Sequence, residues 1–133
     1  LMIALALPVA ADPSAAAAWL RDEQIAEGCP DGGAIASEGL IEIDLNMDGR
    51  DDLVLDHNAM TCRGDWSRSQ FCGVQACSIL LYIRSADGLL MPADEVLGVN
   101  LVFTPGDPPV LSGLAHGGDA WRLRWSGTGF ELF

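Results

Sequence analysis

From residue 40 onwards several segments alternate hydrophobic and polar residues with a period of two, which is typical of strands with one buried face, and residues 78–83 are strongly apolar. In the first such segment, Ile41, Ile43 and Leu45 alternate with Glu42 and Asp44. Glycine-containing turns separate most of the later segments. The predicted strands cover residues 40–45, 53–55, 78–83, 89–90, 96–103, 110–114, 120–125 and 130–133.

The chain before residue 40 has a different pattern and predicts one helix, which opens at residues 12–14 and continues to residue 27. Asp12 is expected to cap this helix, Pro13 to take its first position and Gly28 to end it. An apolar stripe that can pack on a sheet consists of Trp19, Leu20 and Ile25. The predicted fold class is therefore α+β, a single domain with one N-terminal helix packed on an antiparallel β-meander.

Four cysteines occur in the chain, and an even number in a short exported protein is typical of a disulfide framework. Of the three possible pairings we favour Cys72–Cys77, which closes a short glycine-containing loop, together with Cys29–Cys62. Residues 57–76 show little periodicity, so we expect a long loop held by these bridges. A four-thiolate zinc site is the alternative, but the paired C-x-x-C spacing is missing.

Residues 1–11 have the pattern of a signal-peptide remnant, with an apolar run at 1–7 that is followed by small residues. Val9 and Ala11 match the positions three and one before a cleavage point, so the mature domain is expected to span residues 12–133. A buried N-terminal strand or helix is the alternative. The apolar run is too short to span a membrane, which takes about 20 residues. The expected location is secreted or periplasmic.

The balance of charge is strongly acidic, with 19 Asp and Glu against 7 Lys and Arg and a net charge of −12 over 133 residues. Such a surface repels phosphate backbones and anionic lipid headgroups, which disfavours nucleic acid and membrane surfaces as partners. The same acidity suits the binding of cations, although it also commonly serves solubility alone.

The segment D-L-N-M-D-G-R-D-D at residues 44–52 has the ligand spacing of a calcium loop. Calcium takes six to eight hard oxygen ligands, which such loops supply from alternating positions. Gly49 falls where the turn is sharpest, and Arg50 can offer its backbone carbonyl while its guanidinium points outward. Leu55 stands where a helix–loop–helix site has an acidic ligand, so a hairpin loop is expected. The predicted side-chain ligands are Asp44, Asn46, Asp48 and Asp52.

An ordinary turn of Asn, Asp and Gly residues is the alternative to a calcium loop. The crowding of acidic residues at positions 44, 48, 51, 52 and 56 around the single cation of Arg50 argues against a plain turn. Two like charges about 5 Å apart repel by roughly 3 kcal/mol at an effective dielectric constant near 20. A bound cation relieves this repulsion, which favours the calcium loop.

The stretch I-D-L-N-M-D-G-R-D-D-L-V-L resembles the calcium hairpin of FG-GAP and VCBS repeats, whose pattern is D-x-N-x-D-G-x-x-D-L. The tail R-W-S-G-T-G-F is similar to a blade-closing segment of small exported bacterial proteins. This resemblance implies the same ligands at Asp44, Asn46, Asp48 and Asp52, with the carbonyl of Arg50. Met47 stands where the family usually has glycine. The chain holds only one such hairpin, so a propeller function does not follow.

No catalytic constellation frames the remaining polar residues. Ser112, His116 and Asp119 have no nucleophile-elbow motif around them. The other histidine, His57, is expected in a loop or at a strand end. Arg63-Gly64-Asp65 is too short a motif to carry a function. Trp121 and Trp125 share one strand face and are expected to pack in the core, with an aromatic binding platform as the alternative.

The function expected from the sequence is that of an exported, calcium-binding, non-enzymatic binding or structural module with an unidentified protein partner. Two other classes remain open, an exported hydrolase that uses His116 or the bound cation, and an inhibitor of a secreted enzyme that presents the loop between Cys62 and Cys77.

Overall fold

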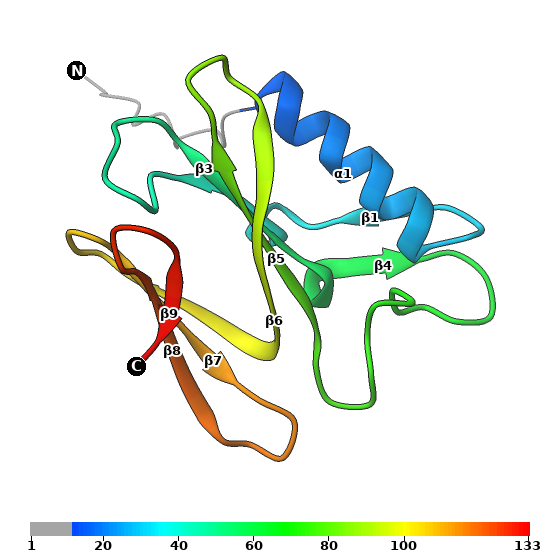
Figure 1. Ribbon diagram of the computed structural model, residues 1–133. Coiled ribbons are helices and arrows are strands. Elements are labelled where there is room, and N and C mark those ends of the chain that lie inside the picture. Colours follow the sequence, from blue (N-terminus) through cyan, green and yellow to red (C-terminus); the bar gives the residue numbers. More distant parts are fainter. Residues whose placement is uncertain (1–11) are drawn as a thin grey trace, which may run out of the picture.

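A computed structural model describes residues 12–133 and shows one helix, α1 (Ala15–Gly28), beside a large antiparallel sheet (Figure 1). The predicted α+β class with one N-terminal helix on an antiparallel meander is confirmed. The predicted leader, residues 1–11, lies outside the described residues, so its cleavage stays a prediction. Within residues 12–133 no helix has the length and apolarity needed to cross a membrane.

Seven strands follow one another across the large sheet, and two further strands form a small sheet of their own. The large sheet has the order β2 (Leu40–Ile43), β3 (Asp52–Asp56), β5 (Cys77–Arg84), β6 (Leu90–Thr104), β7 (Val110–Leu114), β8 (Ala120–Trp125) and β9 (Phe130–Leu132). The small sheet pairs β1 (Gly33–Ile35) with β4 (Met60–Cys62). Two 3₁₀ turns, η1 (Ser37–Gly39) and η2 (His57–Ala59), precede β2 and β4.

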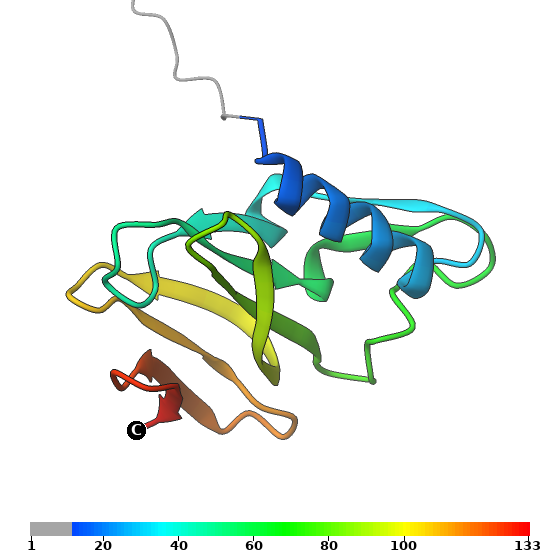
Figure 2. The same ribbon diagram turned by 45° about the horizontal axis from the view of Figure 1, so that its top comes forward.

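Strand β6 folds the large sheet over, because its two parts pair with different neighbours. Residues 90–98 pair with β5, whereas residues 99–104 pair with β7. The register with β7 shifts between Val99 and Val102, and Asn100 has a φ of 58°, as expected at a bulge that bends a strand. The end of β6 with β7, β8 and β9 therefore forms a layer of its own, which lies below the first strands in Figure 2.

The folded sheet and the helix make three layers with two cores. Leu53 and Leu55 of β3 face the helix, while Val54 between them faces the layer of β7 and β8. The helix core consists of Ala17, Leu20, Leu53, Leu55, Tyr82 and Leu90. The core between the two sheet layers consists of Leu45, Val54, Ile79, Leu81, Leu111 and Leu123. Strand β3 is buried along its whole length because both of its faces are covered.

Both predicted disulfides are confirmed, Cys29–Cys62 and Cys72–Cys77. No free cysteine remains, so the four-thiolate zinc site is not formed. The first bridge joins the end of α1 to β4, beside a small apolar cluster that includes Met60. The small sheet is thereby fastened beneath the helix.

Three local predictions differ from the structure. Ser14, and not Asp12, caps the helix, because the Ser14 hydroxyl accepts a hydrogen bond from the amide of Ala17 at 3.2 Å. The region predicted as a loop at 57–76 contains η2 and β4, and the partner strand β1 lies where no strand was predicted. These strands are only three residues long, too short for any period to be visible.

The third difference is that the two strands predicted at 89–90 and 96–103 are one long strand, β6, which begins at Leu90. Pro92 stands within it, and a proline normally argues against a strand because it has no amide hydrogen to donate. The first part of β6 pairs only with β5, so its other edge needs no donor there. The proline is tolerated at this free edge.

Candidate metal centre

The predicted calcium loop is the connection between β2 and β3, residues 44–51, at one end of the sheet (Figure 1). Met47 and Gly49 take left-handed backbone conformations, with φ of 65° and 82°. The chain reverses tightly at these two positions, so side chains at 44, 46 and 48 are directed around one small volume. Gly49 has no side-chain strain there, whereas Met47 does.

Three carboxylates meet at this loop. One oxygen from each of Asp44, Asp48 and Asp52 lies within 4.8 Å of the others, close enough to bind one metal ion together. Asp52 is fully buried at the start of β3, Asp44 is half-buried and Asp48 is exposed. The site therefore reaches from the edge of the core to the solvent.

Backbone amides hold each carboxylate in place. Asp44 Oδ2 accepts from the amide of Gly49 at 2.8 Å, and Asp48 Oδ1 accepts from the amide of Arg50 at 2.9 Å. Asp52 Oδ2 accepts from the amide of Leu45 at 2.8 Å. This last bond closes the loop across its base and explains why Leu45, expected in a strand, is instead buried at the start of the loop.

Two buried oxygens at the loop, Asp44 Oδ1 and Asn46 Oδ1, have no hydrogen-bond donor among residues 12–133. A buried acceptor without a partner costs about 1–3 kcal/mol, so native proteins nearly always supply one. Both oxygens belong to residues whose spacing predicts metal ligation. A cation bound among the three carboxylates would complete the coordination that the protein leaves open.

The titration behaviour of the carboxylates reflects their different depths. Burial raises the pKa of Asp52 above its ordinary value. Hydrogen bonds from the amides of Arg84 and Leu45 favour the charged form and lower the pKa, but by less. The nearby charges of Asp48 and Asp44 raise it further. The amide of Arg50 lowers the pKa of Asp48, chiefly by hydrogen bonding. A cation would lower the pKa of Asp52 by supplying the missing opposite charge.

The guanidinium of Arg50 does not point outward as expected. Its Nη2 lies 3.1 Å from Asp48 Oδ2, since the tight turn brings residues two apart onto the same side of the loop. A pair this exposed contributes roughly 0–1 kcal/mol to the free energy of unfolding. The single positive charge of Arg50 does not balance the three carboxylates, so the loop keeps a net negative charge. The Arg50 carbonyl as a ligand stays a prediction.

Arg84 connects the loop to the rest of the protein, and sequence reasoning missed it. The Arg84 amide donates to the other oxygen of Asp52, Oδ1, at 2.8 Å. Its guanidinium donates to the carbonyls of Asp51 at 2.6 Å and Gly88 at 3.1 Å. It also contacts the helix cap Ser14 and the carboxylate of Glu42, each at 3.1 Å. No local pattern could reveal this role, because the partners of Arg84 other than Gly88 are at least 32 residues away in sequence.

Other residues singled out in the sequence lie on β7, β8 and the turn between them. His116 is exposed in this turn, and within residues 12–133 it makes no hydrogen bond to Ser112 or Asp119. Trp121 packs over Gly98 and Gly113 in the core between the sheet layers, as expected. Trp125 lies edge-to-face on Phe130, with ring centroids 5.2 Å apart.

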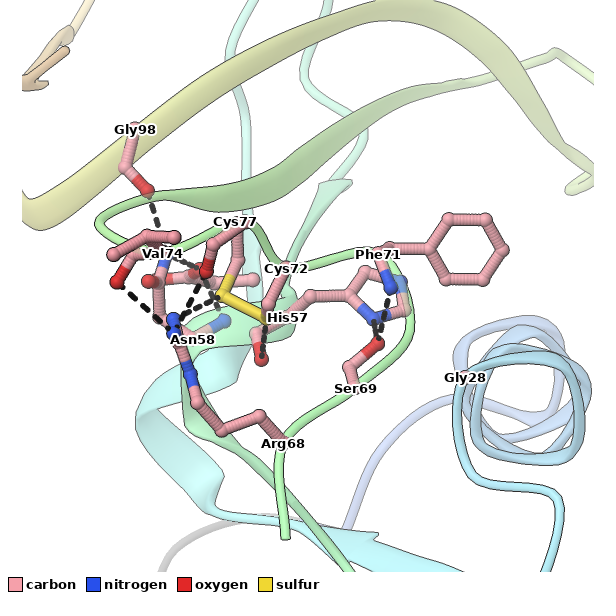
Figure 3. Close-up of a disulfide and its surroundings, with 12 residues drawn as sticks. Gly28, His57, Asn58, Arg68, Ser69, Phe71, Cys72, Val74, Cys77 and Gly98 are labelled. Carbon is pink, nitrogen blue, oxygen red and sulfur yellow. Dashed lines mark hydrogen bonds between the residues drawn. A yellow bond between two sulfur atoms is a disulfide. The ribbon is translucent and has the colours of Figure 1, made fainter. Parts of the chain in front are cut away.

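His57, expected in a loop or at a strand end, begins η2 and is fully buried. Its Nε2 donates to Gln24 Oε1 of α1 at 2.8 Å, so its Nδ1 accepts from the hydroxyl of Ser69 at 2.7 Å. Figure 3 shows this Ser69 contact beside the Cys72–Cys77 bridge. Burial lowers the pKa of His57 to about 4. Because Ser69 is also fully buried, the group ties the helix to the loop and is closed to substrate.

Arg68 fastens the same loop near the second disulfide (Figure 3). Its Nη1 donates to the carbonyls of Gly73 at 2.7 Å and Val74 at 3.2 Å. The tripeptide at 63–65 lies on the exposed part of this loop, and nothing in its surroundings adds to the three residues themselves.

Comparison with known proteins finds no matching family model, no matching curated protein and no matching solved structure.

Proposed function

We propose that this chain is an exported, non-enzymatic binding or structural module whose β2–β3 hairpin is held by one calcium ion. The observation that carries the proposal is the pair of buried, unpartnered oxygens of Asp44 and Asn46 beside three converging carboxylates. The local resemblance to the calcium hairpins of FG-GAP and VCBS repeats supports the same ligand set.

The chemistry of the donors favours calcium over other ions. All predicted ligands are oxygens, whereas zinc and copper prefer the softer nitrogen and sulfur ligands. The donors include a neutral amide and a buried carboxylate on an irregular loop, and calcium accepts such flexible geometry with six to eight ligands. Magnesium demands a tighter octahedron and gives up its water reluctantly.

The role of calcium in this proposal is structural. Asp52 lies at the base of the loop and binds the amides of both Leu45 and Arg84, so a cation there would hold β2, β3 and β5 in register. The two disulfides are compatible with an oxidising, exported location. Extracellular calcium modules commonly bind with dissociation constants of about 10⁻⁴–10⁻³ M, which suits that location.

Thermal unfolding in calcium and in chelator tests the proposal. At about 2 mM calcium and a dissociation constant of about 10⁻⁴ M, binding adds about 1.8 kcal/mol to the free energy of unfolding. For a domain of this size the melting temperature should rise by roughly 7 °C. Magnesium at the same concentration should produce a smaller rise.

The variant Asp48→Ala should abolish the calcium-dependent rise because it removes one ligand. Asp51→Ala is the matched control, since it removes an equal charge from the same hairpin without removing a predicted ligand, and it should keep most of the rise. Identical melting temperatures of the wild-type protein in calcium and in chelator would refute the proposal.

A further inference from the structure

One face of the large sheet is only partly covered by α1. The core beneath the helix includes residues of β3 and β5 but takes only Leu90 from β6. Further along β6, Pro92 and Glu95 are exposed and Leu97 is 62% exposed. Of their strand partners, Tyr82 belongs to the helix core, Leu80 packs against it and Ser78 is buried. The strip of sheet between α1 and the free edge of β6 is called the α1–β6 furrow below.

The furrow is apolar at the end near the start of the helix. A hollow of about 240 Å³ lies there between the first turns of α1 and the start of β6. Trp19 stands at its rim with 65% of its surface exposed, so its ring is accessible to a partner. The hollow is lined by Ala16, Trp19, Leu20, Leu89, Leu90 and Met91.

The furrow is acidic further along. A second hollow of about 340 Å³ is lined by the next residues of β6, 92–95, with Tyr82 of β5. Glu95 lines this hollow together with Tyr82. Burial raises the pKa of Tyr82 to about 12, and the negative charges of Glu23, Glu27 and Glu95 raise it in the same direction. Glu23 and Glu27 follow Trp19 at intervals of four residues, so the three side chains share one side of the helix.

Charge complementarity indicates what binds there. None of the seven arginines lines either hollow, and the chain as a whole carries a net charge of −12. We propose that the α1–β6 furrow docks a cationic amphipathic segment of a partner protein, whose apolar side chains fill the hollow at Trp19 and whose lysines or arginines meet Glu23, Glu27 and Glu95.

Other occupants fit the furrow less well. A second copy of this chain would bring further acidic charge to the glutamates, and an anionic membrane surface would be repelled. The apolar residues 1–11 hold no basic group for the acidic end. Addition of a partner strand to the free edge of β6 is hindered by Pro92 and by Asp94, whose carboxylate already binds the amide of Glu95 at 2.8 Å.

Binding of a synthetic peptide tests the proposal. The furrow follows residues 89–95, about 20 Å of strand, which matches about six extended peptide residues. A fluorescently labelled peptide of leucines interspersed with lysines is titrated at low salt, and binding is measured by anisotropy. Trp19→Ala should weaken binding about tenfold, and the double variant Glu23→Gln with Glu27→Gln about fivefold.

Matched controls separate the furrow from general acidity. Trp66→Ala removes an equally exposed tryptophan from the β4–β5 loop, and Glu38→Gln with Asp107→Asn removes the same charge from exposed sites elsewhere, so both should bind almost as the wild type does. The proposal is independent of the cation site, because Asp48→Ala should keep full affinity for the peptide.

The proposal is overturned if the peptide does not bind, if the controls weaken binding as much as the furrow variants do, or if a peptide with glutamates in place of lysines binds equally well. Dimers of the wild-type protein that Trp19→Ala dissociates would assign the furrow to a second copy instead. Sedimentation with anionic vesicles that depends on Trp19 would assign it to a membrane. Either result also overturns the proposal.

Discussion

Met47 is the one residue of the β2–β3 loop whose backbone conformation conflicts with its side chain. Its φ of 65° is left-handed, which costs a residue with a Cβ about 1–2 kcal/mol. Its side chain is exposed and supplies no oxygen to the site. Met47→Gly should therefore raise the free energy of unfolding by up to about 1 kcal/mol, after the greater flexibility of glycine in the unfolded chain is subtracted.

Urea unfolding of Met47→Gly with and without calcium measures both effects. The calcium-dependent increase in stability should be the same as in the wild-type protein, since no ligand changes. A loss of stability, or of the calcium effect, would show that the Met47 side chain supports the loop in a way its exposure does not suggest.

His57 should make stability depend on pH. Its pKa is about 4 in the folded protein and about 6.5 in the unfolded chain, so below pH 6.5 the unfolded state takes up a proton that the folded state does not. Stability contributed by the neutral, buried ring is complete above about pH 6.5 and falls as the pH falls towards 4. Between about pH 7 and pH 5 the loss should be about 2 kcal/mol.

Comparison of the variant His57→Gln with the wild-type protein isolates this contribution, because both proteins carry the same carboxylates. Glutamine also retains polar groups that can bind Gln24 and Ser69. The decrease in the free energy of unfolding between these two pH values should be about 2 kcal/mol smaller in the variant. Equal decreases in the two proteins would show that His57 titrates normally.

At this scale, spacing alone predicted which carboxylates come together, since Asp44 and Asp48 lie in one tight loop and Asp52 begins the next strand. The roles of Arg84 and His57 could not be predicted. Asp52 is 32 residues from Arg84, and Gln24 is 33 residues from His57. Such pairs form only when the strands have found their order.

Among the elements, the two disulfides should contribute unequally to stability. Cys29–Cys62 joins residues 33 apart in sequence and Cys72–Cys77 residues 5 apart. Each bridge lowers the entropy of the unfolded chain by closing a loop. This stabilises the folded protein by about 4 kcal/mol for the longer bridge and about 2 kcal/mol for the shorter. Replacing both cysteines of each bridge by alanine and measuring unfolding in urea should reproduce this order.

A larger loss from the Cys72–Cys77 variant would contradict the loop-entropy account. That outcome would mean that the β4–β5 loop is held chiefly by its own bridge and not by Arg68 and His57, which also fasten it.

The elements that the sequence predicted well are those with enough residues to show a period. Helix α1 and strands β5, β7 and β8 were expected within a few residues of their positions. Strand β6 was divided in two because Pro92 and the charged residues 94–95 interrupt its pattern, and these are tolerated only because that edge is free. The three-residue strands β1 and β4 depend on each other and on Cys29–Cys62.

In the whole molecule, Arg84 joins the β2–β3 hairpin, the helix cap and the β5–β6 turn. The antiparallel meander was predictable from the turns along the chain. The folding of the sheet onto itself could not be predicted, because it depends on a bulge at Asn100. It also depends on the absence of side chains at Gly98 and Gly113, which leaves room for the Trp121 ring. The central place of β3, with both faces covered, follows from that fold.

If the protein is exported, its mature chain should lack the predicted leader. The apolar run and small residues at 1–11 should be removed after Ala11. N-terminal sequencing of protein recovered from a periplasmic or secreted fraction should therefore begin at Asp12, or within one or two residues of it. A mature protein that retains Leu1 would contradict the leader and weaken the argument for an oxidising location.

The central claim is that one calcium ion binds in the β2–β3 hairpin, and a crystal structure of the protein grown with millimolar calcium tests it most directly. We predict one ion with oxygen ligands at about 2.3–2.6 Å from Asp44, Asn46, Asp48 and Asp52, with the Arg50 carbonyl completing the set. Asp44 Oδ1 and Asn46 Oδ1, which have no hydrogen-bond donor in the part of the chain that the structure describes, should both face the ion. A well-ordered hairpin with water or no density at this position would contradict the claim.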